Sequence, residues 1–246
     1  MKIVVHPKYH NYRDFITQIP AAFYKNGDTI YKGRNIVKRF INDKNEWIIK
    51  KYKRPNIIQQ LVYTFFKKSK AERAYLFAEK LLAAGIATPE GVAYIEEKRY
   101  GLIRDCYFIS TSCLDPAVYP ILVETDNYDR ELASNLAAFF VQLHSKGILH
   151  GDPNLNNILY HKSREEIFLF SVIDTNRSIF KSSLTKQDCL NNLKRVTHRR
   201  DLLQYITKEY AKLRKWDIQD SVSRVMKALD RFEKLKKIRR LIKGKK

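Results

Sequence analysis

The most informative stretch of this chain reads His150-Gly151-Asp152-Pro153-Asn154-Leu155-Asn156-Asn157-Ile158-Leu159. It places Asp152 five residues before Asn157, directly after a helix-forming segment and directly before an apolar strand. In a loop with this spacing, the carboxylate can accept the proton of a reacting hydroxyl while the amide oxygen holds a metal ion. The spacing therefore predicts that Asp152 is the catalytic group and that Asn157 is a metal ligand. We expect His150 to brace the loop rather than to react.

The segments around this loop predict a mostly helical second half. Residues 129–146 place apolar side chains on one face of a helix, and Gly147 follows as its end. Two short apolar strands are expected at 158–160 and 167–173. From Thr185 the pattern is helical, and Thr185 with Asp188 resembles a capping box.

The first half has a different pattern, with short strands and one main helix. Strand patterns occupy 46–52, 91–96 and 101–109, whereas residues 70–84 follow a helical period. The composition changes near residues 110–118. We therefore expect an α+β fold, with a small, mostly β lobe at 1–110 that binds the nucleotide and a larger, mostly helical lobe at 111–246.

Two strands carry further candidate residues for phosphate and metal binding. Alternation along a strand puts Ile48 and Lys50 on one face, so Ile48 would cover an adenine while Lys50 reaches the phosphates. Lys51 would do the same with Ile49 on the other face, and both registers stay open. The apolar strand that ends at Ile173 is followed by Asp174, 22 residues after Asp152, where a second metal ligand is expected.

Other parts of a nucleotide site are more weakly indicated. The helix at 70–84 offers Glu72 and Glu79 as partners for the phosphate-binding lysine, and Glu72 is favoured because it lies nearer the helix N-terminus. For a glycine-containing phosphate loop, only Gly33 is available in the strand-rich first segment. The sequence contains no GxxxxGK[ST] pattern, which excludes a P-loop nucleotide site.

Composition limits the class of partner. The chain has 246 residues and a formal net charge of +21, a field that attracts polyanions such as nucleic acid, anionic membranes or phosphorylated glycolipids. Its three cysteines show no CxxC or Cys/His cluster, which fits a reducing cytoplasm. No run approaches the ~18 apolar residues of a membrane span.

Together these motifs resemble the lipopolysaccharide kinase (Kdo/WaaP) family of bacterial proteins. The resemblance spans roughly residues 30–205 and rests on the segments 85–90, 143–152, 157–159 and 173–177. It implies a two-lobed, protein-kinase-like fold similar to that of RIO kinases. It also implies ATP- and Mg²⁺-dependent phosphorylation of a Kdo or heptose sugar in the lipopolysaccharide inner core, with Asp152 catalytic and with Asn157 and Asp174 as metal ligands.

The choice of substrate depends on two further features. Only about ten residues separate Asp174 from the helix expected at Thr185, fewer than the activation segment of a protein kinase needs. This favours a glycolipid acceptor over the alternative of a RIO-like atypical protein kinase. A polyanion- or nucleic-acid-binding module with a degenerate kinase fold is the remaining alternative, and the presence of Asp152, Asn157 and Asp174 argues against it.

The C-terminal segment indicates where the protein acts. Residues 231–246 contain nine Lys/Arg and one acid, with Leu235, Ile238, Leu241 and Ile242 at helical spacing. A basic amphipathic helix of this kind predicts binding to an anionic membrane surface. We therefore expect a peripheral protein on the inner face of the cytoplasmic membrane. The sequence indicates no protein partner.

Overall fold

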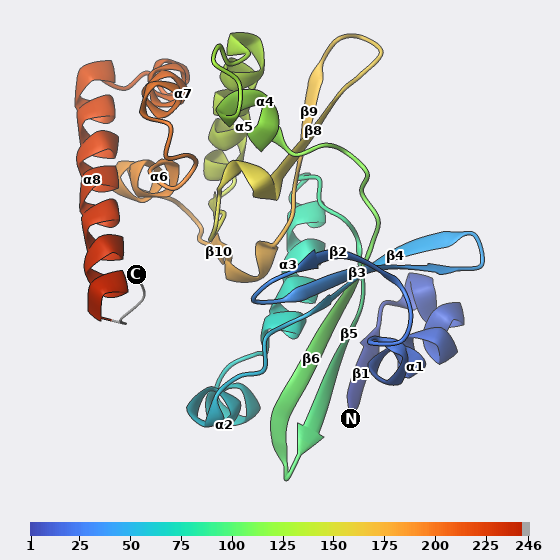
Figure 1. Ribbon diagram of the computed structural model, residues 1–246. Helices are drawn as coiled ribbons and strands as arrows, with labels where there is room; N and C mark the ends of the chain where they lie inside the picture. Colours follow the sequence, from blue (N-terminus) through green and yellow to red (C-terminus); the bar gives the residue numbers. More distant parts are fainter. Residues whose placement is uncertain (243–246) are drawn as a thin grey trace. The chain divides into compact units, whose positions relative to one another are not determined.

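The computed structural model describes residues 1–242 and divides into two compact units (Figure 1). The first unit contains Met1–Leu114 together with Asp174–Arg177, and the second contains Asp115–Ile173 and Ser178–Lys246. The expected boundary after residue 110 falls inside a strand, Leu102–Thr111, and the division follows Leu114 instead. The first unit also includes Asp174–Arg177, which follows residues of the second unit in the chain. A single boundary drawn from composition cannot describe this.

The first unit is built on a six-stranded antiparallel sheet in the order β1-β5-β6-β4-β3-β2. Its strands are β1 (Lys2–Val5), β2 (Asp28–Lys32), β3 (Ile36–Asn42), β4 (Asn45–Lys51), β5 (Gly91–Arg99) and β6 (Leu102–Thr111). Its helical elements are η1 (Pro7–Tyr12), α1 (Arg13–Ala22), α2 (Ile57–Phe65), α3 (Lys70–Ala83) and η3 (Thr175–Arg177). The main helix and the strands β4 to β6 match the sequence prediction, whereas α1 and α2 do not appear in it.

Each face of this sheet is covered by a different helix. On one face, Trp47 and Ile49 of β4 are buried in a cluster with Ile16 and Ile19 of α1. On the other face, Tyr94 and Cys106 pack against Ala74 of α3. Successive strand residues point to opposite faces, so β4 presents its odd-numbered residues to α1 and its even-numbered residues to the face of α3.

The second unit is mostly helical. Its elements are α4 (Val118–Val123), α5 (Arg130–Ser145), β7 (Ile148–Leu149), η2 (Leu155–Asn157), β8 (Ile158–Lys162), β9 (Phe168–Val172), β10 (Ile179–Phe180), α6 (Lys186–Leu193), α7 (Arg200–Leu213) and α8 (Ile218–Ile242). The α5 helix begins at the Asp129 cap, and α6 begins at the predicted Thr185–Asp188 capping box. The α+β fold class predicted from the sequence is confirmed.

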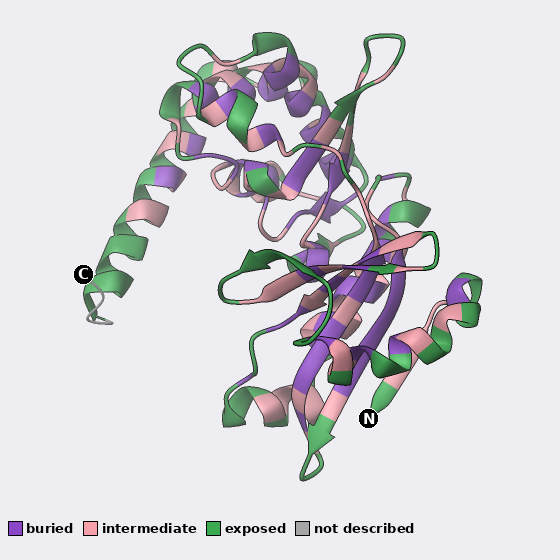
Figure 2. Ribbon diagram, turned by 45° about the vertical axis from the view of Figure 1, so that its right-hand side comes forward, coloured by how far each residue is buried: buried purple, intermediate pink, exposed green. Residues whose placement is uncertain are grey.

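The two ends of α8 have different surroundings. Ser221, Val225 and Leu229 are buried and face the rest of the second unit, where α8 contacts α6 and α7. Beyond Leu229 the helix becomes exposed, as its colour change in Figure 2 shows. The basic segment predicted at 231–246 forms this exposed half up to Ile242, and its last four residues lie outside the described part. No helix within residues 1–242 is long and apolar enough to cross a membrane.

A glycine controls how the chain enters the loop at residue 150. Gly147 follows α5 with a φ of +72°, and a Cβ added there would lie 1.9 Å from the carbonyl oxygen of Lys181. The same approach allows the Lys181 N–H to donate to the Gly147 carbonyl at 2.9 Å. The short strands β7 and β10 pair antiparallel beside this contact. Any side chain at position 147 would push the strand before the loop away from its partner.

Candidate active site

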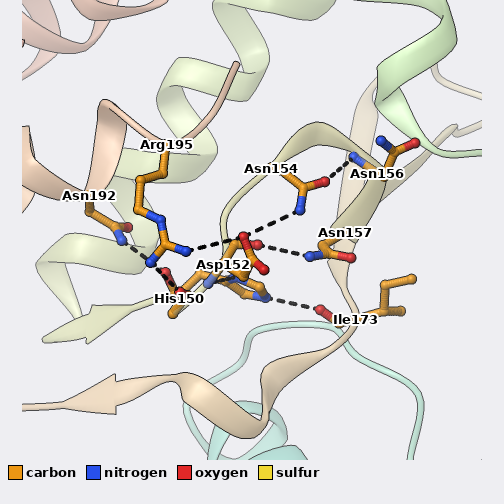
Figure 3. A network of polar contacts seen from close by, with 9 residues as sticks. His150, Asp152, Asn154, Asn156, Asn157, Ile173, Asn192 and Arg195 are labelled. Carbon is orange, nitrogen blue, oxygen red and sulfur yellow. Dashed lines mark hydrogen bonds and ion pairs between the residues drawn. The ribbon is translucent and has the colours of Figure 1, made fainter. Parts of the chain in front are cut away.

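The loop at residues 150–157 is braced by the buried ring of His150 (Figure 3). The backbone N–H of Asp152 donates to its Nδ1 at 3.1 Å, so this nitrogen carries no proton. The opposite nitrogen, Nε2, therefore donates to the carbonyl of Ile173 at 3.0 Å. His150 thus ties the start of the loop to the end of β9 and has both ring nitrogens engaged, as a bracing role requires.

Asp152 is held from several sides while its carboxylate stays partly accessible. Asn157 donates from Nδ2 to the backbone carbonyl of Asp152 at 2.9 Å, which closes the loop across five residues. Asn154 makes a long contact of 3.4 Å with the Oδ1 of Asp152. The Asp152 side chain is 32% exposed, so a reacting group can approach it.

Arg195 is a contact of Asp152 that the sequence analysis did not predict. It lies after α6 and donates to the Gly151 carbonyl at 2.7 Å, while its second terminal nitrogen is 3.4 Å from the Asp152 carboxylate. The guanidinium also lies over the ring of Phe232 in α8, 5.8 Å from its centroid. Arg195 therefore positions the carboxylate and places a positive charge beside it. No local sequence pattern predicts this role, because Arg195 is one of 47 Lys and Arg residues in the chain.

A buried polar network supports the loop from behind. Asn192 donates from Nδ2 to the His150 carbonyl at 2.8 Å, so its Oδ1 must accept from the Nε2 of His144 at 3.1 Å. The Nδ1 of His144 then accepts from the Tyr210 hydroxyl at 2.9 Å. Burial lowers the pKa of His144 to about 4, an effect that the Asn192 hydrogen bond offsets only in part. The network therefore uses a neutral imidazole at neutral pH.

Asn157 is held in place by two hydrogen bonds, and its role as a metal ligand stays a prediction. It ends η2, whose first turn is capped by Asn154, and its backbone carbonyl accepts from the Ile173 N–H at 3.0 Å. Its Nδ2 donates to Asp152, which leaves Oδ1 without a protein donor within residues 1–242. An amide oxygen held in this way is a suitable ligand for a hard cation such as Mg²⁺.

The first unit contains a second polar centre, an ion pair between Lys50 and Asp174. The Lys50 ammonium lies 2.7 Å from Oδ1 of Asp174, and the two side chains are 15% and 31% exposed. The same oxygen of Asp174 accepts from Asn176 in η3. Asp174 has a φ of +55°, a conformation that costs most residues energy but that Asp tolerates better than most.

Tyr52 adds an apolar wall beside this pair. Its buried ring lies 5.3 Å from the Lys50 ammonium. Burial, together with the nearby Asp174 carboxylate, raises the pKa of the Tyr52 hydroxyl well above its ordinary value. Lys50 is therefore flanked by a neutral ring on one side and by a carboxylate on the other.

The two possible lysine registers are now distinguished. Lys51 lies on the opposite face of β4, with its ammonium 2.8 Å from the Tyr107 hydroxyl and 3.2 Å from the Asp105 carboxylate. Burial lowers the pKa of Lys51, but the Tyr107 hydrogen bond and the charge of Asp105 outweigh it and raise the pKa overall. Lys51 is thus part of a buried structural cluster, and Lys50 is the lysine that lies at Asp174.

Ile48 and Gly33 are the remaining residues predicted to bind the nucleotide. Ile48 is half-buried on the same face of β4 as Lys50, in agreement with the expected alternation. Gly33 lies in the exposed turn between β2 and β3, where its N–H donates to the Asn35 carbonyl at 3.0 Å. Their contact with a nucleotide stays a prediction.

Glu72, the acid expected to pair with Lys50, pairs with other residues instead. Glu72 contacts Lys68 at 2.9 Å and Lys2 at 3.9 Å, and within residues 1–242 the ion pair of Lys50 is with Asp174. The reason is local: Ser69 caps α3 and puts Glu72 in its first turn, one helical turn from Lys68. The other candidate, Glu79, lies 3.8 Å from His6.

The donor set limits where a metal ion could bind. The described residues contain no group of three or more His, Cys, Asp or Glu side chains able to enclose a metal. The candidate ligands are the carboxylate of Asp174 and the amide of Asn157, which belong to different units. Each is a single oxygen-donor side chain, which suits Mg²⁺ bound mainly through substrate phosphates and water better than a protein-only metal cage.

The chain is similar to one protein family and to two solved structures. Residues 17–216 match the model of the "Lipopolysaccharide kinase (Kdo/WaaP) family". Among solved structures, the chain is similar to WaaP in complex with acyl carrier protein, with a TM-score of 0.63, 17% sequence identity, and coverage of 96% of this chain and 99% of that one. A weaker similarity is to the Rio2 kinase–ADP/Mg²⁺–phosphoaspartate complex from Chaetomium thermophilum, with a TM-score of 0.49, 14% identity, and coverage of 92% and 71%.

No curated protein matches the sequence. The family match nevertheless spans most of the chain, including the loop at Asp152 and the strand that carries Lys50. The protein is therefore a member of the lipopolysaccharide kinase (Kdo/WaaP) family and shares the fold of WaaP.

Proposed function

We propose that this protein transfers the γ-phosphoryl group of ATP to a hydroxyl of an inner-core sugar of lipopolysaccharide, Kdo or heptose. Membership of the family supports a kinase of lipopolysaccharide. The observation that carries the proposal is the Lys50–Asp174 ion pair. A lysine and a carboxylate at this pair of positions supply a cation for phosphate oxygens and an anion for the metal that accompanies them.

Each residue of the chain has a distinct task in this reaction. Lys50 would exchange Asp174 for the α- and β-phosphates, which frees that carboxylate to act as a ligand for Mg²⁺; Asn157 is the metal ligand predicted in the second unit. Mg²⁺ supplies charge that offsets the negative phosphate oxygens. Asp152 would orient the acceptor hydroxyl and take its proton as the new P–O bond to the γ-phosphorus forms and the bond from the γ-phosphorus to the bridging oxygen breaks, releasing ADP. Arg195 and the brace at His150 would hold the Asp152 carboxylate in one position, since phosphoryl transfer depends chiefly on alignment.

The segment after Asp174 supports a sugar acceptor over a peptide. Between Asp174 and the start of α6 at Lys186 the chain forms only η3 and the two-residue strand β10. This stretch is shorter than the platform that holds a peptide substrate in a protein kinase. An inner-core glycolipid presents its hydroxyl on a compact head group and does not need such a platform.

The charge of the protein supports a location at an anionic membrane surface. The exposed half of α8 places Leu235, Ile238, Leu241 and Ile242 among basic residues, with exposed fractions between 41% and 79%. Each basic residue close to an anionic leaflet contributes about 1 kcal/mol. We therefore infer a peripheral protein on the cytoplasmic face of the inner membrane, where the acceptor would lie within reach.

A single assay tests the proposal. Purified protein is incubated with labelled ATP, Mg²⁺ and three acceptors: Kdo₂-lipid A, heptosylated core lipopolysaccharide, and a generic protein substrate. Label transfer to one of the two glycolipids is the expected result, and its position identifies the sugar. Transfer to the protein substrate alone would favour a RIO-like protein kinase, and the absence of any transfer by folded protein would refute the kinase assignment.

A further inference from the structure

The helix α2 exposes most of its apolar side chains to solvent. It spans nine residues, Ile57–Phe65, and none of them is buried. Four of its apolar side chains, together with Phe66 directly after it, are exposed to solvent, whereas Val62 and Tyr63 are half-buried: Ile57 62%, Ile58 68%, Leu61 44%, Phe65 67% and Phe66 82%. We refer to these five residues as the α2 apolar face. A helix on the surface of a soluble protein normally turns such a face inward.

The opposite side of α2 shows why the apolar face points outward. Gln60 donates from Nε2 to the Pro55 carbonyl at 3.0 Å, and the hydroxyl of Thr64 accepts from the Ile103 N–H of β6 at 3.0 Å. The Thr64 bond attaches α2 to β6 of the sheet, and the Gln60 bond ties the helix to the segment that precedes it. Because these bonds hold the helix in this rotation, the α2 apolar face cannot turn inward without losing both of them.

The surroundings of this face are cationic. Residues 53–70 contain five Lys/Arg (Lys53, Arg54, Lys67, Lys68 and Lys70) and no Asp or Glu. Arg54 and Lys68 also contact carboxylates of the first unit, whereas Lys53 and Lys67 are exposed and form no ion pair within residues 1–242. Exposed Ile, Leu and Phe side chains bracketed by lysines are typical of a helix that lies in the interface of an anionic bilayer.

A second exposed segment lies next to α2. The β5–β6 hairpin turns at Tyr100 and Gly101, directly before the part of β6 that α2 contacts. Its tip carries Lys98 and Arg99, and Tyr100 is 88% exposed. Figures 1 and 2 both show the hairpin tip and α2 at the same end of the sheet. Tyrosine with neighbouring cations is a common combination at the boundary between lipid and water.

We propose that the α2 apolar face inserts into the interfacial layer of an anionic lipid bilayer and so docks the first unit on the membrane that contains its acceptor. The nature of that acceptor rests on the proposed function above. Charge argues against a second copy of this chain as the occupant, because two faces bordered by lysines on a chain of charge +21 would repel each other. The exposed half of α8 belongs to the other unit and is a separate contact.

The first test measures insertion directly. Phe66→Trp is mixed with vesicles of phosphatidylglycerol and phosphatidylcholine whose acyl chains are brominated, and Ile41→Trp is the matched control. Ile41 lies on β3 of the same unit and is 67% exposed. We expect lipid-dependent quenching for the α2 variant and none for the control. Equal fluorescence of Phe66→Trp with brominated and ordinary lipid would overturn the proposal and favour a soluble protein as occupant.

The second test separates insertion from electrostatic adsorption. Ile58→Glu and Ile41→Glu remove one isoleucine of nearly equal exposure, 68% and 67%, and change the net charge by the same amount. We expect Ile58→Glu to weaken partitioning into the same vesicles by about tenfold, because it removes a fully inserted side chain, and Ile41→Glu to change it by less than about twofold. An equal loss in both variants would mean that charge alone binds the protein and would overturn insertion.

The final arm distinguishes a failure of docking from a failure of the proposed function. Wild type and Ile58→Glu are assayed with lipopolysaccharide in vesicles and with delipidated core oligosaccharide in solution. We expect Ile58→Glu to lose transfer to the vesicle acceptor and to keep transfer to the soluble one. Quenching of Phe66→Trp without any transfer by wild type would support docking and refute the kinase. Transfer to vesicles that is unaffected by Ile58→Glu would overturn the docking role.

Discussion

Lowering the pH should reduce the free energy of unfolding of the second unit, because the buried His144 must take up a proton. His144 is 3% exposed, and burial lowers its pKa from an ordinary 6.5 to about 4. Between these two values the unfolded chain binds a proton that the folded protein does not, so stability falls as the pH decreases through this window. A difference of about 2.5 pKa units, at about 1.4 kcal/mol each, corresponds to about 3 kcal/mol. Above about pH 6.5 this contribution is fully present.

The measurement is urea unfolding of the second unit at about pH 7 and at about pH 4.5. Trp216 is a suitable fluorescent reporter because it packs edge-on against Tyr210 of the same network, at 5.7 Å between centroids. A Trp47→Phe background removes the signal of the first unit. His144→Gln is the comparison, since it keeps a donor for Asn192 but does not titrate. If both proteins lose the same free energy of unfolding on acidification, the reasoning about His144 is refuted.

Four further outcomes are expected from the same residues. Asp152→Ala should abolish phosphoryl transfer while ATP binding, measured by calorimetry, persists; full activity would exclude a catalytic role. Lys50→Met should weaken ATP binding with little effect on unfolding, whereas Lys51→Met should cost about 2 kcal/mol of stability because it removes the charged hydrogen bond to Tyr107 and one of the cations at Asp105, which keeps Arg54; the reverse pattern would overturn the assigned register. Arg195→Ala should lower kcat about tenfold at unchanged KM, with partial recovery in Arg195→Lys, as expected if one charged hydrogen bond aligns the carboxylate; an unchanged kcat would contradict a positioning role. Deleting residues 231–246 should reduce binding to anionic vesicles, and unchanged binding by the folded truncation would refute a role for α8 at the membrane.

The secondary structure was most predictable where local signals agree with packing. The helix at 70–84, the helix at 129–146 and the capping box at Thr185 all appear within a residue or two of their expected bounds. Helix α1 was missed although Ile16, Ile19 and Phe23 have a helical spacing, because its interior Pro20 and short length resemble a turn. Helix α2 was missed because its apolar face does not lie in the core.

The contacts of the candidate site that could be predicted are those between residues close together in the sequence. Asp152 and Asn157 are joined across five residues by one hydrogen bond, so their relation is encoded in the spacing itself. The sequence alone therefore determined the contact within the loop at 150–157, the strand that ends before Asp174, and the family.

Only the tertiary structure decided which partners these residues have. A strand places alternate side chains on both faces, so nothing local distinguishes Lys50 from Lys51 until α1 covers one face and leaves the other to Asp174. Arg195 reaches Asp152 from 43 residues away, a contact that no short pattern contains. The rotation of α2 depends in the same way on a hydrogen bond to β6. Spacing specifies contacts within one element, whereas contacts between distant elements depend on packing that the whole chain must form first.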